Sequence, residues 1–337
     1  MSHFHVYAIG NALVDTEYQV SDEELLSMAV EKRHMTLIDE QRRAALLHQV
    51  HGKTPNRSGG GSAGNTAVAL SQLGGNAFYS CRVADDELGC FYTRDLEEHG
   101  VATNLSHTKA KHGQTGSCMV FVTPDAERSM CTFLGATAEL EASALHPKDI
   151  ARSKIYYMEG YLAASPSGLA AALEGRDLAR NHGVALALTL SDVSMIRFCR
   201  TGLEAMIGDG IDFLFCNEEE AQFWTGFTNF EQVQAAMTGI AKVVCITRGA
   251  KGCMVQTPND VIEVPSLPVK PVDTNGAGDM FAGAFLYATT HGYRLQQAAL
   301  LGNMAAAAVV SQHGNRLSDE NLASIKQDFM KLANHTH

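Results

Sequence analysis

The sequence predicts an α/β fold with a mainly parallel sheet and a small separate unit of β-structure. From about residue 153 onward, short apolar runs alternate with segments of helical spacing, a pattern typical of buried parallel strands joined by helices. Two stretches, about 15–35 and 105–134, do not follow this alternation. With 337 residues, 45% of them hydrophobic, the chain can bury a large core.

In the first half of the chain, periodicity and breaker residues place the elements in order. An apolar strand is followed by a polar segment, and acidic residues mark the N-termini of two helices. A polar glycine-rich stretch predicts a loop. We expect strands at 4–10 and 76–83, helices at 21–29, 39–50, 65–73 and 88–99, a loop at 52–64, and a hairpin of strands 117–122 and 128–134.

The second half contains the clearest alternation. The expected strands are 155–158, 185–190, 213–216 and 243–247, the helices 169–181, 218–225 and 230–241, followed by a hairpin at 255–264 and alanine-rich helices at 279–290 and 295–313. We therefore expect one domain over 1–337, in which the two exceptional stretches form a small β lid.

Composition excludes several classes of function. The net charge of −11 and the lack of a basic stripe argue against nucleic-acid binding. No apolar run reaches about 18 residues, so no transmembrane helix is expected. The eight cysteines are scattered without a C-x-x-C pair, which favours free thiols over a zinc site. The N-terminal residues do not have the pattern of a secretory signal, so we expect a cytoplasmic protein.

The strongest motif is Asp273-Thr274-Asn275-Gly276-Ala277-Gly278-Asp279, directly before an apolar helix. Small residues permit a tight turn whose N–H groups, together with the helix dipole, favour a bound anion. Asp279 at the same helix start is placed to accept a proton from a hydroxyl, as phosphoryl transfer requires. A plain helix cap is the alternative interpretation of a shorter G-A-G-D.

A second glycine motif runs from Gly59 to Gly74. It satisfies G-x-G-x-x-G, but a dinucleotide-binding loop should follow a strand, and residues 51–58 are polar. A nicotinamide-dependent oxidoreductase is therefore disfavoured. Asn65 either binds substrate hydroxyls or caps a helix, and the residues alone leave both interpretations open.

Together these two motifs resemble the paired signatures of the PfkB/ribokinase family of carbohydrate kinases. The resemblance covers about residues 4 to 330 and implies a three-layer, Rossmann-like (ribokinase-like) core with a β lid. It implies ATP and Mg²⁺, with Asp279 as the base and the amides of Gly276, Ala277 and Gly278 as an anion hole.

The resemblance also assigns the remaining site residues. It implies nucleotide contacts by Asn217, Thr247, Gly249, Gly252 and Asn303, and a water-mediated contact of Glu220 with Mg²⁺. Asp273 and Asn275 occupy the places of a K⁺ or other monovalent-cation site. The implied substrate-binding residues are Asn11, Asp15, Gly60, Gly61, Ser62 and Asn65.

Within the family the chain looks most similar to the adenosine-kinase-like branch, so the favoured substrate is the 5′-hydroxyl of adenosine. Asp15 can accept bonds from two vicinal ribose hydroxyls, while Phe133 and Tyr161 are candidates for a base slot. The alternatives are a sugar kinase for ribose, fructose or a keto-sugar acid, and a non-catalytic ligand-binding protein. We expect small molecules as partners, and either a monomer or a homodimer.

Overall fold

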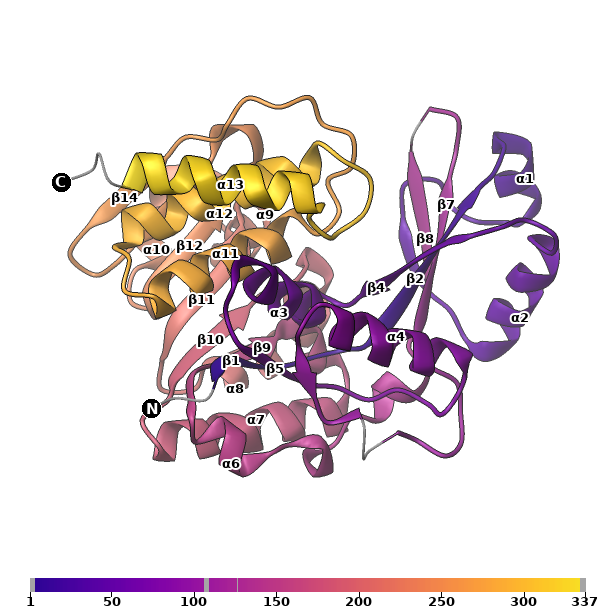
Figure 1. The fold of residues 1–337 in the computed structure, drawn as a ribbon, viewed down its shortest axis with the longest axis horizontal. Helices are drawn as coiled ribbons and strands as arrows, with labels where there is room; N and C mark the ends of the chain where they lie inside the picture. Colours follow the sequence, from indigo (N-terminus) through magenta and orange to yellow (C-terminus); the bar gives the residue numbers. More distant parts are fainter. Residues whose placement is uncertain (1–3, 106–108, 126, 334–337) are drawn as a thin grey trace.

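The computed structural model describes residues 4–105, 109–125 and 127–333, and its main sheet has nine strands in the order β14-β13-β12-β11-β10-β9-β1-β5-β6 (Figure 1). Strands β12, β11, β10, β9, β1, β5 and β6 run parallel to one another. Strands β13 and β14 pair antiparallel at one lateral edge of the sheet. Their bounds are β1 (Phe4–Ile9), β5 (Ala77–Ser80), β6 (Ala102–Thr103), β9 (Ser153–Glu159), β10 (Ala185–Thr189), β11 (Ile211–Asn217), β12 (Ala241–Thr247), β13 (Cys253–Gln256) and β14 (Val261–Val264).

Helices cover both faces of this sheet. Val6 and Ala8 of β1 belong to one core cluster and Tyr7 and Ile9 to another, as expected for a strand buried on both sides. The first face carries α3 (Ser62–Leu73), α4 (Glu87–Glu98), α11 (Ala277–Thr290), α12 (Leu295–Val310) and α13 (Asp319–Ala333). The second carries α6 (Pro147–Ile150), α7 (Pro166–Asn181), α8 (Val193–Ile207), α9 (Glu218–Thr225) and α10 (Phe230–Met237). The predicted fold class is confirmed.

A second sheet stands beside this core (Figure 1). Its order is β3-β8-β7-β2-β4, with β2 (Leu13–Gln19), β3 (Met35–Leu37), β4 (Asn56–Gly60), β7 (Ser117–Val122) and β8 (Arg128–Phe133). Helices α1 (Asp22–Ser27) and α2 (Glu40–Gln49) pack on one face, against Tyr18, Met119 and Phe121. On the opposite face, the register aligns Asp15, Cys118, Thr132 and Leu37 across four strands.

Two predictions of local structure were wrong, and two long helices were not predicted. The expected loop at 52–64 contains β4, whose polar residues become a strand by pairing with β2. Helix α3 begins at Ser62, with Gly61 as its N-cap, instead of at Asn65. Helices α8 and α13 were not predicted, and in α8 a non-helical backbone at Cys199 interrupts the periodicity.

The cysteines match the prediction of free thiols. All eight are unpaired, and six of them are buried, where they pack as small apolar side chains. Within the described ranges, no helix combines the length and the apolar character needed to cross a bilayer.

Candidate active site

The start of α11 leaves backbone donors free. Gly276 is the N-cap in a left-handed conformation, with φ of +76°, which favours glycine. Among the described residues, the N–H groups of Gly276 and Gly278 donate to no protein acceptor, while Ala277 N contacts the Thr274 carbonyl at 3.4 Å. A Cβ built on Gly278 would meet nothing within 4 Å. Free donors at the positive end of a helix can hold an anion.

Asp279 lies in the first turn of α11, and its carboxylate contacts two residues of α3. Ser62 Oγ donates to Asp279 Oδ1 at 2.6 Å, and Asn65 Nδ2 donates to Oδ2 at 2.9 Å. Burial raises the pKa of Asp279 to about 6, although both hydrogen bonds and the nearby Arg316 guanidinium lower it. At neutral pH this carboxylate is ionised and basic enough to accept a proton in catalysis.

Gly60 and Gly61 allow the junction between β4 and α3 to pack against the segment that follows β1. A Cβ on Gly61, whose φ is +88°, would lie 2.0 Å from the Asn11 carbonyl oxygen. A Cβ on Gly60 would lie 2.5 Å from Asp15 Oδ1. Neither position has room for a side chain, so the predicted substrate residues of both segments meet at one place.

Asp15 has a carboxylate that accepts no hydrogen bond from the described protein atoms. Burial raises its pKa to about 7, partly offset by the charges of Arg316 and Arg128. Asn11 is already bound, because Thr137 Oγ1 lies 3.4 Å from its Oδ1 and its main-chain carbonyl accepts from Tyr79. Asp15 is therefore the residue with acceptor capacity left for a ligand.

Glu159, which sequence reasoning missed, lies buried at the carboxyl end of β9 with 1% of its surface exposed. Its Oε2 accepts from Ala63 N at 2.8 Å and its Oε1 from Asn11 N at 3.3 Å. Burial raises its pKa to about 8. The available signal was its place at the end of an apolar parallel strand, where α/β sheets carry their sites.

The predicted nucleotide side lies at the ends of β11 and β12. Asn217 and Thr247 are register partners there. Asn217 and Glu220 form a capping box at the start of α9, in which Asn217 Nδ2 donates to Glu220 Oε1 at 2.6 Å. Burial raises the pKa of Glu220 to about 7, and the charge of Asp279 adds to the rise. The two predicted sides thus share one electrostatic environment.

Gly249 and Gly252 shape the turn after β12. Both have positive φ, +56° and +94°, and a Cβ on Gly252 would lie 2.0 Å from the Val264 carbonyl. Asn303 is 5% exposed and its Nδ2 donates to the carbonyls of Val264 (2.9 Å) and Pro265 (3.1 Å). Asn303 thus holds the end of β14, and its contact with a nucleotide stays a prediction.

Asp273, predicted near a monovalent cation, already has a protein cation beside it. Arg128 lies 3.0 Å from its Oδ2, and the N–H groups of Asn275 and Gly314 donate to its two oxygens at 3.0 and 3.2 Å. The Asn275 side chain is exposed. A further cation here would have to be held by backbone carbonyls.

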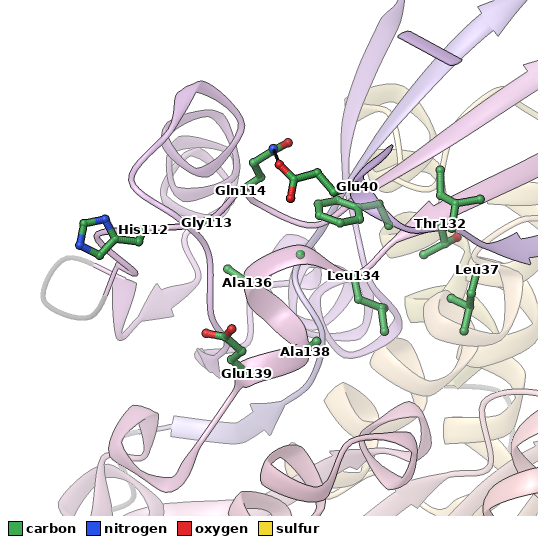
Figure 2. Close-up of a pocket in the computed structure, with 13 residues that line it drawn as sticks. Leu37, Glu40, His112, Gly113, Gln114, Thr132, Leu134, Ala136, Ala138 and Glu139 are labelled. Atoms are coloured by element: carbon green, nitrogen blue, oxygen red, sulfur yellow. Dashed lines mark hydrogen bonds between the residues drawn. The ribbon is translucent and has the colours of Figure 1, made fainter. Parts of the chain in front are cut away.

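A cavity of about 390 Å³ lies between the second sheet and the 3₁₀ helix η1 (Gly135–Glu139). Figure 2 shows Leu37 and Thr132 on one side of it, and Ala136, Ala138 and Glu139 of η1 on the other. Phe133 also lines it, with the Arg43 guanidinium 5.4 Å from its ring centre. Since Thr137 of η1 accepts from Ala12 N at 2.9 Å, the cavity adjoins the substrate loop.

A family model for pfkB family carbohydrate kinases matches residues 31–322. The chain belongs to this family. It is therefore a kinase that acts on a hydroxyl group, as the two glycine motifs predicted.

The relatives of this pfkB-family kinase divide between nucleoside and sugar kinases. The structure of adenosine kinase from Sinorhizobium meliloti is 34% identical, with a TM-score of 0.88 over 96% of this chain and 99% of that chain. Adenosine kinase from Schizophyllum commune is 28% identical over 93% of this chain and 97% of its own length. Ribokinase from Mus musculus is 27% identical over 77% of this chain and 80% of its own.

The residues present fit a metal ion carried in with a nucleotide. No cluster of three or more His, Cys, Asp or Glu side chains in the described part of this pfkB-family kinase could hold a metal by itself. Glu220 is buried and both its oxygens accept from Asn217. Since Mg²⁺ commonly keeps several waters and uses substrate phosphates, Glu220 suits the predicted contact through water.

Proposed function

We propose that this pfkB-family kinase transfers the γ-phosphoryl group of ATP to the 5′-hydroxyl of a nucleoside, with adenosine as the favoured substrate. The observation that carries the proposal is the contact of Asp279 with Ser62 and Asn65. It joins a carboxylate at an anion-binding helix start to the glycine segment expected to hold the substrate.

In the proposed reaction, Asp279 accepts the proton of the attacking hydroxyl. The hydroxyl oxygen forms a bond to the γ-phosphorus while the bond from that phosphorus to the β–γ bridging oxygen breaks, and ADP leaves. The amides of Gly276, Ala277 and Gly278 donate to the oxygens of the transferred group, where negative charge gathers. Asn217, Thr247, Gly249 and Gly252 would line the donor, and Mg²⁺ would neutralise its phosphates.

One feature favours a nucleoside over a free sugar, because the acceptor capacity of Asp15 suits the vicinal hydroxyls of either. The 390 Å³ cavity beside the Asn11 loop has apolar walls from Leu37, Phe133 and Leu134. A free sugar has no group to fill such a cavity, whereas a base would bury its faces there. Tyr161, the other base candidate, instead packs against the second core cluster.

The second sheet is proposed as the lid of this site, in one domain with the main sheet. Its face bearing Asp15, Thr132 and Leu37 would cover the substrate and exclude water during transfer. A requirement for K⁺, a homodimer or monomer, and a cytoplasmic location remain proposals taken from the sequence.

The test is an ADP-release assay with MgATP and a panel of adenosine, other nucleosides, ribose, fructose and a keto-sugar acid. We expect the highest kcat/KM with adenosine, and a rise in melting temperature when adenosine alone is added. Faster turnover of a sugar would replace the nucleoside with the second candidate, a sugar kinase. No ADP with any acceptor would overturn the proposal. Replacing KCl by tetramethylammonium chloride tests the cation.

A further inference from the structure

The loop between α12 and α13 reaches the catalytic carboxylate through a chain of hydrogen bonds. Asn315 in this loop is 3% exposed, and its Nδ2 donates to the Gly59 carbonyl at 3.0 Å and to Asn65 Oδ1 at 3.2 Å. Asn65 Nδ2 in turn donates to Asp279 Oδ2 at 2.9 Å. The chain joins residues that lie about 250 positions apart in sequence, Asn315 and Asn65.

The direction of this chain follows from its first member. The Gly59 carbonyl can only accept, so Asn315 must turn its NH₂ group toward it. The same NH₂ group faces Asn65, which must therefore present its oxygen. That leaves the NH₂ group of Asn65 for Asp279, whose ionised carboxylate can only accept. Each amide orientation is set by the group before it.

The loop is anchored where this chain begins. Arg316 Nη2 donates to the Gly59 carbonyl at 3.2 Å and to Asp95 Oδ2 of α4 at 2.9 Å. A Cβ on Gly276 would lie 2.9 Å from Asn315 Cβ, so the loop also packs directly on the start of α11. Asn315 is thus fixed against both motifs.

One atom of the Asn315 side chain lowers the stability of the fold, so stability alone does not account for an asparagine at this position. Its Oδ1 is buried and accepts no hydrogen bond, and an unsatisfied buried acceptor lowers stability. An alanine would remove this group but would also leave Asn65 free to turn its amide.

We propose that Asn315 is a positioning residue that fixes the amide of Asn65, so that the NH₂ group of Asn65 always donates to Asp279. This inference rests on the proposed function, in which Asp279 is the base. The hydrogen bond from Asn65 favours the ionised form of Asp279, so losing its orientation leaves the base protonated up to a higher pH.

The experiment compares pH profiles of kcat/KM for wild type, Asn315→Ala, Asn65→Ala and the double variant, using the acceptor that gives most ADP. We expect the acid limb to move to higher pH by about one unit in Asn315→Ala, the size of one hydrogen bond to a charged group. The double variant should match Asn65→Ala, because Asn315 acts through Asn65. The titration of ATP is common to all four proteins.

Asn321→Ala is the matched control. Asn321 binds Gln312 of the same loop through a 2.7 Å hydrogen bond, and its loss should leave the profile unchanged. Asn315→Leu, of similar size and shape but without the NH₂ donor or a charge, gives the same prediction should the alanine variant unfold. An unshifted acid limb in the folded Asn315 variants, or full additivity in the double variant, would overturn the inference. Asp279→Asn with near wild-type turnover would instead overturn the proposed base.

Discussion

Carboxylates beside the carboxyl ends of the main-sheet strands, here called the main-sheet edge, have one kind of electrostatic environment. Carboxylates on the helices and hairpin of the second sheet have the opposite kind. At the main-sheet edge, burial raises the pKa of Glu159 to about 8, of Glu220 to about 7 and of Asp279 to about 6. Around the second sheet, Lys32 pairs with Asp125 at 2.7 Å, and this contact lowers the pKa of Asp125. The exposed carboxylates are solvated and paired, whereas the buried ones are held near one another.

This difference indicates which region performs chemistry. Grouping ionisable carboxyls in a poorly hydrated edge destabilises their charged forms, and such grouping is common at functional sites. Ion pairs on an exposed surface contribute little stability and are screened by salt. Variants of the two regions should therefore differ in whether they change catalysis or stability.

The largest effect is expected for Asp279→Asn. Loss of the base should lower kcat by about 10³-fold or more, within the range of general-base and charge effects combined. The variant can still contact Ser62 and Asn65, so adenosine should still raise its melting temperature. ADP release and a thermal shift measured on one preparation check both statements. Retained turnover would remove Asp279 from the chemistry.

Arg128 is where the two regions meet, and its removal should cost the most stability. It lies between Glu17 of β2 at 2.8 Å and the buried Asp273 at 3.0 Å. In Arg128→Ala, the Asp273 carboxylate keeps only its backbone donors, and an uncompensated buried charge costs about 3 kcal/mol. Denaturant unfolding measures this loss.

Arg57→Ala is the control for that variant. Arg57 binds Glu87 between β4 and α4 at 2.6 Å, but the Glu87 side chain is 78% exposed. Its loss should change the free energy of unfolding by less than about 1 kcal/mol. Equal losses of unfolding free energy in Arg128→Ala and Arg57→Ala would mean that the stabilising effect of Arg128 does not depend on the burial of Asp273.

The sequence predicted the local structure at 273–279 better than the elements of the second sheet. The heptapeptide has a local physical reason for its composition, a tight glycine turn before a helix, so a helix start with Asp279 in its first turn could be predicted. Strand β4 has no such local reason, because its polar residues form a strand only by pairing with β2.

The same limit applies to contacts between distant segments. The cavity takes its walls from β3, the 112–114 segment, β8 and η1, and no single window of sequence contains that arrangement. Glu159 and Asn315 are single polar residues whose burial depends on how helices and loops pack over them. Their contacts with Ala63 and Asn65 could be identified only from the folded structure.

A smaller effect is expected at the helix start itself, where two glycines two positions apart should respond oppositely. Gly276 has φ of +76° and would place a Cβ 2.9 Å from Asn315, so Gly276→Ala should cost about 1–2 kcal/mol. Gly278→Ala has open space and helical backbone, so it should be neutral or stabilise by up to about 1 kcal/mol. Melting temperatures compare the two, and a destabilised Gly278→Ala would contradict the open helix start.

The effect of Glu159 appears only as a slope of stability against pH. Its folded pKa of about 8 lies above the unfolded value near 4.5, so the folded state binds more protons between these values. The stability from the protonated form is fully present below about pH 4.5 and is lost as pH rises through about 8. Glu159→Gln resembles the protonated acid at every pH. The difference in unfolding free energy between wild type and variant should therefore change with pH by at most about 1.4 kcal/mol per unit. Denaturant unfolding from pH 5 to 9 measures it, and parallel curves would show that the Glu159 carboxyl does not titrate in this range. Such parallel curves would mean that the Asn11 and Ala63 amides hold Glu159 ionised throughout this range, which places it with the paired carboxylates of the surface instead.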